Sequence, residues 1–160
     1  MILGVGLDLV SLSGMAEQLA TPGSKFLDRI LTPREHRTVH HRSPGSGPSC
    51  VCAQDPAAVE RIGALWAVKE AVVKAWSAAI FGKPPPLSEE ELVWTEIEVV
   101  HDHWEHPAIE LHNHVGEAFR RTLMGSGRHA WHVSTSRGHG FAMATVILSG
   151  TEGPSPHAGQ

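Results

Sequence analysis

Residues 61–80 of this 160-residue chain read RIGALWAVKEAVVKAWSAAI. The stretch contains no proline and one early glycine, and a run this long and this apolar predicts a helix rather than a strand. At 100° per residue, Trp66, Glu70 and Lys74 share one side of that helix. The opposite side is apolar as well, so we expect a buried helix on which the rest of the chain packs.

Glu70 and Lys74 are charges within this apolar helix, spaced i, i+4 in the favourable order. On an exposed surface such a pair stabilises a helix by about 0.2–0.5 kcal/mol. In a buried helix, desolvation costs several kcal/mol for each ion. We therefore favour a functional interpretation over a surface ion pair, because charges inside an apolar run often mark a site.

The composition is that of a single globular domain, with 41% hydrophobic residues. No apolar run approaches the length of a membrane span, and the N-terminal segment lacks a basic leader, so neither a membrane anchor nor a signal peptide is expected. The two cysteines, Cys50 and Cys52, are too few and too close for a disulfide framework, which predicts a reducing, cytoplasmic setting. The net charge of −4 argues against a nucleic-acid partner.

Charge is spread unevenly along the chain. Residues 25–42 hold five Lys or Arg residues against two carboxylates, whereas residues 89–110 hold eight carboxylates and no Lys or Arg. A basic segment can steer an acidic partner. On charge alone, a solvated face is the simpler interpretation.

Residues 2–10 read ILGVGLDLV and predict a strand. One side of this strand holds Gly4, Gly6 and Asp8, where a second backbone or a ligand can approach closely. By itself, Asp8 is equally consistent with a residue that caps the next segment. We expect the core-facing side to carry Leu3, Val5, Leu7 and Leu9.

The rest of the pattern alternates short helices and strands. A Thr32-Pro-Arg-Glu35 capping box predicts a helix to about residue 41. We expect further helices at 15–19, 25–31 and 115–124, and strands at 93–99, 108–112, 129–136 and 141–148. We also expect a mobile loop at 43–56, with Asp55-Pro56 starting the long helix. The expected fold class is α+β, with an antiparallel sheet packed on the long helix, in one domain at 1–149 followed by a flexible tail at 150–160.

Two motifs together resemble a known family. These are Gly4-Val-Gly-Leu-Asp8 and Trp66-Ala-Val-Lys-Glu70-Ala-Val-Val-Lys74-Ala75. The combination resembles the holo-[acyl-carrier-protein] synthases, the small bacterial class of 4′-phosphopantetheinyl transferases, and the resemblance extends to residue 149. Further matches are Arg29-Ile-Leu-Thr-x-x-Glu35, Trp131-His132-Val-Ser134 and Ala142-x-Ala-x-Val146.

The resemblance implies a 4′-phosphopantetheinyl transferase-like fold and transfer of 4′-phosphopantetheine from coenzyme A to a serine of an apo acyl carrier protein or carrier domain, with release of adenosine 3′,5′-bisphosphate. It implies that Asp8 and Glu70 hold Mg²⁺, and two carboxylates with substrate phosphate oxygens suit that ion. Glu70, directly or through a metal-bound water, is the expected base. Lys74 is expected to stabilise the leaving group, and His132, on one strand face with Ser134, to contact coenzyme A phosphates.

The resemblance also implies a homotrimer with active sites between subunits, and docking of an acidic carrier on Lys25 and Arg29. This chain departs from the family pattern at several places, one of which is Glu105-His-Pro107 where Gly-x-Pro is common. Gly14 and Leu65 stand where arginines are common, and Ser77–Ala79 stands where Gly-Thr-Gly is common. The choice of carrier and the tolerance for acyl-coenzyme A are therefore left open.

Two alternatives stay open at this point. A zinc-binding protein would use Cys50, Cys52, His101, His103 and His106, although Cys-x-Cys does not fit the usual spacing of zinc ligands. A non-catalytic carrier-binding module of the same fold is the second alternative. The retained Asp8, Glu70 and Lys74 argue against it.

Overall fold

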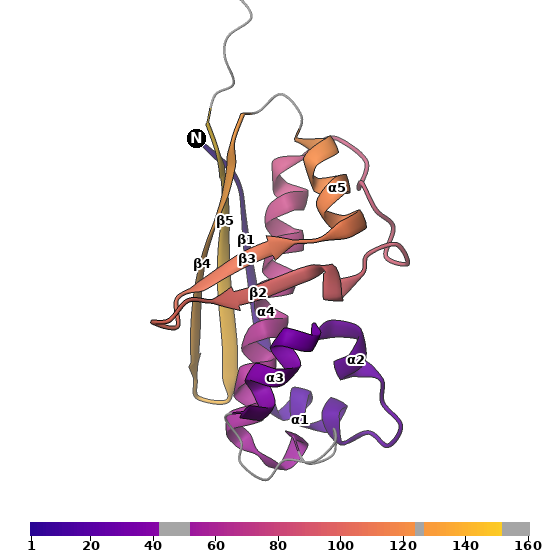
Figure 1. Ribbon diagram of the computed structural model, residues 1–160, viewed down its shortest axis with the longest axis vertical. Helices are drawn as coiled ribbons and strands as arrows, with labels where there is room; N and C mark the ends of the chain where they lie inside the picture. The colour runs from indigo at the N-terminus through magenta and orange to yellow at the C-terminus, as the bar shows by residue number, and fades with distance from the viewer. Residues whose placement is uncertain (42–51, 124–126, 152–160) are drawn as a thin grey trace, which may run out of the picture.

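The computed structural model describes residues 1–41, 52–123 and 127–151 (Figure 1). Most of the loop expected at 43–56, and residues 152–160 of the expected tail, lie outside this described part. The elements in chain order are β1 (Ile2–Ser11), α1 (Leu12–Ala20), α2 (Phe26–Ile30), α3 (Pro33–His41), η1 (Cys52–Gln54), α4 (Pro56–Ala79), η2 (Trp94–Glu96), β2 (Ile97–His101), β3 (Pro107–Leu111), α5 (Asn113–Thr122), β4 (His129–Gly138) and β5 (Phe141–Gly150).

The strands form two antiparallel sheets. The larger sheet has the order β1-β5-β4, and β2 pairs with β3 in a separate hairpin. Helix α4 runs along the long strands, α5 lies beside its upper half, and α1 to α3 gather at its lower end (Figure 1). The α+β prediction is confirmed, with a second sheet in addition to the one that packs on the long helix.

Helix α4 begins where the sequence predicts. The Asp55 side chain accepts a hydrogen bond from the Ala57 amide at 3.0 Å, and Pro56 occupies the first helical position. Half of the helix is buried, including Ile62, Val68 and Val72. The helix therefore forms the centre of the core, as expected for a stretch that is apolar nearly all round.

The orientation of β1 differs from the prediction. Gly4 and Gly6 face α4, and a Cβ on either would collide with the carbonyl oxygen of Ala75 or of Ala71. The strand and the helix can approach this closely only without side chains between them. The expectation that the leucine and valine side faces the core is therefore wrong. Leu3 is half-buried, and Val5, Leu7 and Leu9 are each more than half exposed, at 52%, 52% and 56%.

Strand β5 is the central strand of the larger sheet, as its apolar character on both faces predicts. Ala142, Ala144, Val146 and Leu148 are buried against the helices, while Phe141 and Met143 are exposed on the opposite face. The strand continues to Gly150, and the Thr151 amide donates to the Arg128 carbonyl at 2.9 Å. Strand β5 thus includes residue 150, the first residue of the expected tail.

The region before β2 also differs from the prediction. A strand was expected from residue 93, but Trp94–Glu96 forms the 3₁₀ turn η2 and the strand begins at Ile97. The Trp94 ring packs on Trp66 with centroids 4.6 Å apart, and the Trp94 carbonyl accepts a hydrogen bond from Lys69 Nζ at 3.1 Å. These tertiary contacts hold a turn where local alternation alone favours a strand. Of the helices in the described part of the chain, none combines the length and apolar character needed to cross a membrane.

Candidate functional site

Three of the predicted site residues meet where β1 lies against α4. Lys74 Nζ donates to Asp8 Oδ1 at 2.7 Å, so a residue of the helix binds one of the strand. The Asp8 side chain is 15% exposed and that of Lys74 is 49% exposed. Glu70 lies one helical turn before Lys74 and is half-buried. Asp8 follows Gly6 on the same side of the strand, so the close strand–helix packing brings its carboxylate to the helix.

The electrostatics of Glu70 show that it shares this place with Asp8. Burial raises the pKa of Glu70, the neighbouring Asp8 carboxylate raises it further, and Lys74 acts in the opposite direction. Two carboxylates that repel each other while partly removed from water favour a bound cation. Oxygen donors are the ligands that Mg²⁺ prefers, and it takes one or two protein carboxylates together with water and phosphate oxygens. The residues present therefore fit the expected ion.

The observed exposure of Glu70 and Lys74 corrects the argument that both charges are buried in the helix and costly to desolvate. Trp66, Glu70 and Lys74 do share one side of α4, but this side is only partly buried, and Lys74 is exposed. The desolvation cost assigned to Lys74 is therefore wrong for the single chain. The exposed position arises because the β1–α4 contact uses the glycine side of the strand and leaves the side chain of Lys74 at its margin.

Helix α4 does carry a fully buried charge, at Lys69, which sequence reasoning missed. Its Nζ lies 2.9 Å from Glu35 Oε2 and also donates to the carbonyl oxygens of Ile30 and Trp94. Burial lowers the pKa of Lys69, against the opposing charge and hydrogen bond of Glu35. A signal existed in the sequence, because Lys69 lies on the helix side that holds the buried residues Leu65, Val72 and Trp76.

His132 and Ser134 lie on the other face of the larger sheet. They pair with Ile147 and Thr145 of β5, whereas Asp8 pairs with Ala144, which is buried on the helix side. Cross-strand partners share a face and neighbours along a strand alternate. Within one chain, therefore, the structure does not bring His132 and Ser134 together with Asp8. Instead, His132 Nε2 is 2.9 Å from the hydroxyl oxygen of Ser149.

Lys25 and Arg29 lie at the two ends of α2, and both are exposed. Arg29 borders an open hollow of about 600 Å³ whose walls include Phe26, Trp66 and Trp94. The Phe26 and Trp66 rings are 5.5 Å apart in an edge-on arrangement. The lining also includes the carboxylates of Asp28, Glu89 and Glu90, so charges of both signs border this aromatic hollow. Of the departures from the family pattern, Leu65 is buried, and Ser77–Ala79 forms the last turn of α4.

The histidines of the zinc alternative do not gather into a site. His106 Nδ1 lies 2.9 Å from Asp102 Oδ2 in the β2–β3 turn. Among the described residues, the group of three potential metal ligands is a different one, formed by Glu98, Glu110 and His112. Cys50 and the side chain of Cys52 lie outside the described part of the chain.

Comparison with known proteins connects this geometry to a class. The family model of the 4′-phosphopantetheinyl transferase superfamily matches residues 4–146. A holo-[acyl-carrier-protein] synthase of Corynebacterium glutamicum (strain R) is 36% identical over 148 residues, which cover 92% of this chain and 98% of the relative. The synthase of Mycobacterium leprae (strain TN) is 37% identical over 147 residues, which cover 92% and 96%. A solved structure of the ACPS–CoA complex of Chronobacterium ammoniagenes has a TM-score of 0.77 and 33% identity, and the match covers 93% of this chain and 98% of that one.

The fold, with a glycine-rich strand packed on a long helix and a carboxylate on each, defines a 4′-phosphopantetheinyl transferase. Within that class the chain belongs to the holo-[acyl-carrier-protein] synthase family, and it is an enzyme. The resemblance drawn from the two motifs is confirmed.

Proposed function

We propose that this enzyme transfers 4′-phosphopantetheine from coenzyme A to a serine hydroxyl of an apo acyl carrier protein or carrier domain, with Mg²⁺ as its cofactor. The observation that carries the proposal is the convergence of Asp8, Glu70 and Lys74 between β1 and α4. The relatives named as holo-[acyl-carrier-protein] synthases, and the related structure with coenzyme A, support the choice of substrates.

The residues have distinct roles in this reaction. Asp8 and Glu70 would hold Mg²⁺, which neutralises charge on the pyrophosphate of coenzyme A when bound. Glu70, directly or through a water molecule, accepts the proton of the serine hydroxyl. The serine oxygen forms a bond to the phosphorus that carries pantetheine, and the bond from that phosphorus to the bridging oxygen breaks. Lys74 stabilises the negative charge on the departing adenosine 3′,5′-bisphosphate.

We also propose a homotrimer in which neighbouring chains complete each site. Val5, Leu7 and Leu9 form an exposed apolar face on the larger sheet, joined by Phe141 and Met143. Exposed apolar surface of this kind is typical of interfaces. Because His132 and Ser134 lie on this same face, they would reach the Asp8 site of a neighbouring chain rather than that of their own, and would there contact coenzyme A phosphates.

The carrier is expected to dock beside α2. Lys25 and Arg29 are exposed cations at the two ends of α2, and Arg29 borders the aromatic hollow, which suits an acidic partner with an apolar anchor. The cytoplasmic setting rests on the use of the two cysteines and stays a prediction.

Mass spectrometry of an apo carrier protein incubated with this enzyme, coenzyme A and Mg²⁺ tests the proposed function. The carrier should gain the mass of one phosphopantetheine group, and the gain should require Mg²⁺. A carrier whose acceptor serine is replaced by alanine is the matched control. Binding of the carrier without any gain in mass would instead support the non-catalytic module.

A further inference from the structure

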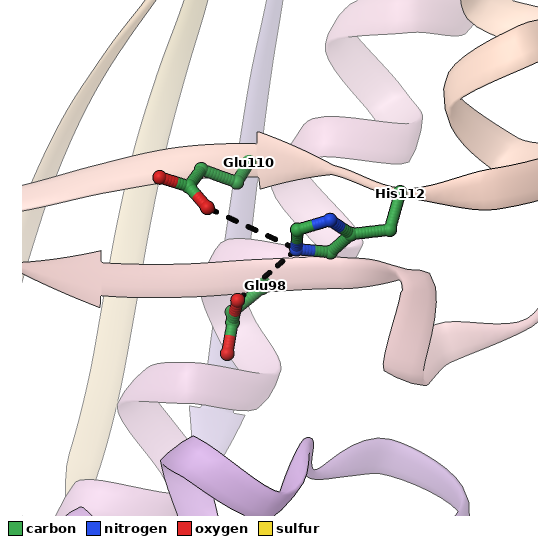
Figure 2. Close-up of side chains that lie close together, drawn as sticks. All are labelled: Glu98, Glu110 and His112. Atoms are coloured by element: carbon green, nitrogen blue, oxygen red, sulfur yellow. Dashed lines mark hydrogen bonds and ion pairs between the residues drawn. The ribbon is translucent and has the colours of Figure 1, made fainter.

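The β2–β3 hairpin carries a group of metal-ligating side chains that uses none of the residues of the proposed transferase site. Figure 2 shows Glu98 of β2, Glu110 of β3 and His112, just beyond β3, converging on one point. His112 Nε2 lies 3.0 Å from Glu98 Oε2 and 3.9 Å from Glu110 Oε2. One ligand atom from each residue lies within 4.8 Å of the other two.

The pairing of the two glutamates is costly without a positive charge between them. Glu98 and Glu110 are direct partners across the antiparallel pair, so their side chains lie on the same face. Like charges in this position destabilise a hairpin. A cation at the point of convergence, or a proton on His112, relieves this repulsion.

The buried glutamate is held in position for a ligand role. Thr32 Oγ1 donates to Glu98 Oε1 at 2.8 Å, which directs the other oxygen, Oε2, at the cluster. Hydrogen bonds from outside the ligand shell orient metal ligands in this way.

We propose that Glu98, Glu110 and His112 form a binding site for a divalent transition-metal ion of the zinc class. A mixed set of one imidazole nitrogen and two carboxylate oxygens suits Zn²⁺, whereas Mg²⁺ prefers oxygen ligands alone. Around tetrahedral zinc, ligand bonds of about 2.0–2.2 Å place neighbouring ligand atoms roughly 3.3–3.6 Å apart. The two separations from His112 Nε2 lie on either side of this range, so modest side-chain rotations close the site.

The exposed side of the cluster provides the remaining coordination position. The side chains of Glu110 and His112 are 52% and 40% exposed, while that of Glu98 is 11% exposed. Water can therefore complete a three-residue site, and the ion can enter directly from solvent. Because β2 reaches Thr32 through Glu98, the bound ion would clamp the hairpin to the beginning of α3.

Zinc titration of tag-free protein tests the site. The protein carries Cys50→Ser and Cys52→Ser to remove thiol ligands, and Mg²⁺ is present throughout to occupy the carboxylates of the transferase site. Calorimetry should show one Zn²⁺ per chain, and Zn²⁺ should raise the melting temperature. Glu110→Gln and His112→Gln should each weaken Zn²⁺ binding at least tenfold while transferase activity measured without Zn²⁺ is unchanged.

The matched control is His106→Gln. His106 lies in the turn of the same hairpin and also contacts a carboxylate, Asp102, at 2.9 Å. Zinc binding should be unaffected in this variant. Absence of stoichiometric binding, or equal binding by the parent protein and His112→Gln, would overturn the proposal in favour of a protonated His112 that bridges the two glutamates. Loss of binding only in His106→Gln would also overturn it, by assigning the ion to the other histidines. Circular dichroism of each variant verifies that its fold is retained.

Discussion

Lys69 and Glu35 form an ion pair of 2.9 Å whose side chains are 0% and 1% exposed. Glu35 also accepts hydrogen bonds from the Thr32 amide and the Val99 amide, both at 2.8 Å. The pair thereby joins α4 to the start of α3 and to β2. Lys69 directly precedes Glu70, so this buried network fixes the part of α4 that carries the proposed base.

Breaking this pair should be among the most destabilising single changes to the chain. Glu35→Gln leaves the Lys69 ammonium buried without its counter-ion, and we expect a loss of about 3–5 kcal/mol in the free energy of unfolding. Lys69→Met should have an effect of similar size. The double variant should lose clearly less than the sum of the two, because residues in one network are not additive. Urea denaturation of the four proteins measures these differences.

Glu117→Gln provides the control, because Glu117 is an exposed carboxylate on α5. It should alter stability by less than about 0.5 kcal/mol. Equal stability of Glu35→Gln and the parent protein would show that the pair does not hold the fold together.

Asp8 and Glu70 should act as one unit in catalysis. Asp8→Asn and Glu70→Gln preserve shape but remove a charge proposed to hold Mg²⁺, so each should raise the Mg²⁺ requirement and lower turnover by orders of magnitude. The double variant should be scarcely worse than the poorer single variant, because residues that serve the same step are non-additive. The rate of carrier modification at several Mg²⁺ concentrations measures this. Independent, multiplying losses would contradict a shared ion.

In the metal-free protein, Glu70 should make the free energy of unfolding depend on pH. Its pKa is raised above the ordinary value of 4.5 by burial and by Asp8. Between that value and the raised pKa, the folded state binds more protons than the unfolded state, so the free energy of unfolding falls as pH rises through this window. Glu70→Gln removes this decline, and the pH profile should become flatter. Urea denaturation in chelator across mildly acidic pH compares the two proteins, and identical slopes would contradict the assignment.

Carrier docking should depend on Lys25 and Arg29. Reversal of both to glutamate should slow association with an acidic carrier and reduce the dependence of that rate on salt, because complementary charge acts mainly on encounter. Affinity for coenzyme A should change little. Stopped-flow binding measures the rate. Arg120→Glu with Arg121→Glu, an equal charge change on exposed residues of α5, is the matched control and should leave the carrier association rate nearly unchanged.

The sequence predicted features that depend on residues close together in the chain better than features that depend on tertiary packing. The capping box at Thr32 and Glu35 and the start of α4 at Asp55 are local, and the structure has both. The side of β1 that faces the core was predicted wrongly, because apolar residues on an isolated strand do not reveal whether they pack on a helix or on another chain. Glycines at every second position were the stronger signal, since they permit the backbone contact with α4.

The candidate site shows the same limit. The motifs placed Asp8, Glu70 and Lys74 in one site, and the structure brings these three together. The partner of Lys69 could not be predicted, because Glu35 is distant in sequence and its capping role already explained it. The cluster of Glu98, Glu110 and His112 depends on the register of β2 with β3, which alternation alone does not determine.

Mixing two inactive variants should restore activity if the sites lie between chains. Asp8 faces α4, whereas His132 lies on the opposite face of the same sheet, so a site that needs both must draw them from different subunits. Asp8→Asn and His132→Ala should each reduce activity when assembled alone. In trimers formed by co-expression of both variants, random assembly gives about a quarter of the sites an intact Asp8 from one chain and an intact His132 from its neighbour. Carrier modification by the mixed trimers should therefore recover to about a quarter of the parent rate, measured per site on protein whose trimeric state is verified by light scattering.

The control is the double variant, with both changes in one chain, co-expressed with Asp8→Asn. It should recover nothing, since no intact Asp8 remains. A mixed assembly as inactive as its parents would contradict a site that takes Asp8 from one chain and His132 from its neighbour.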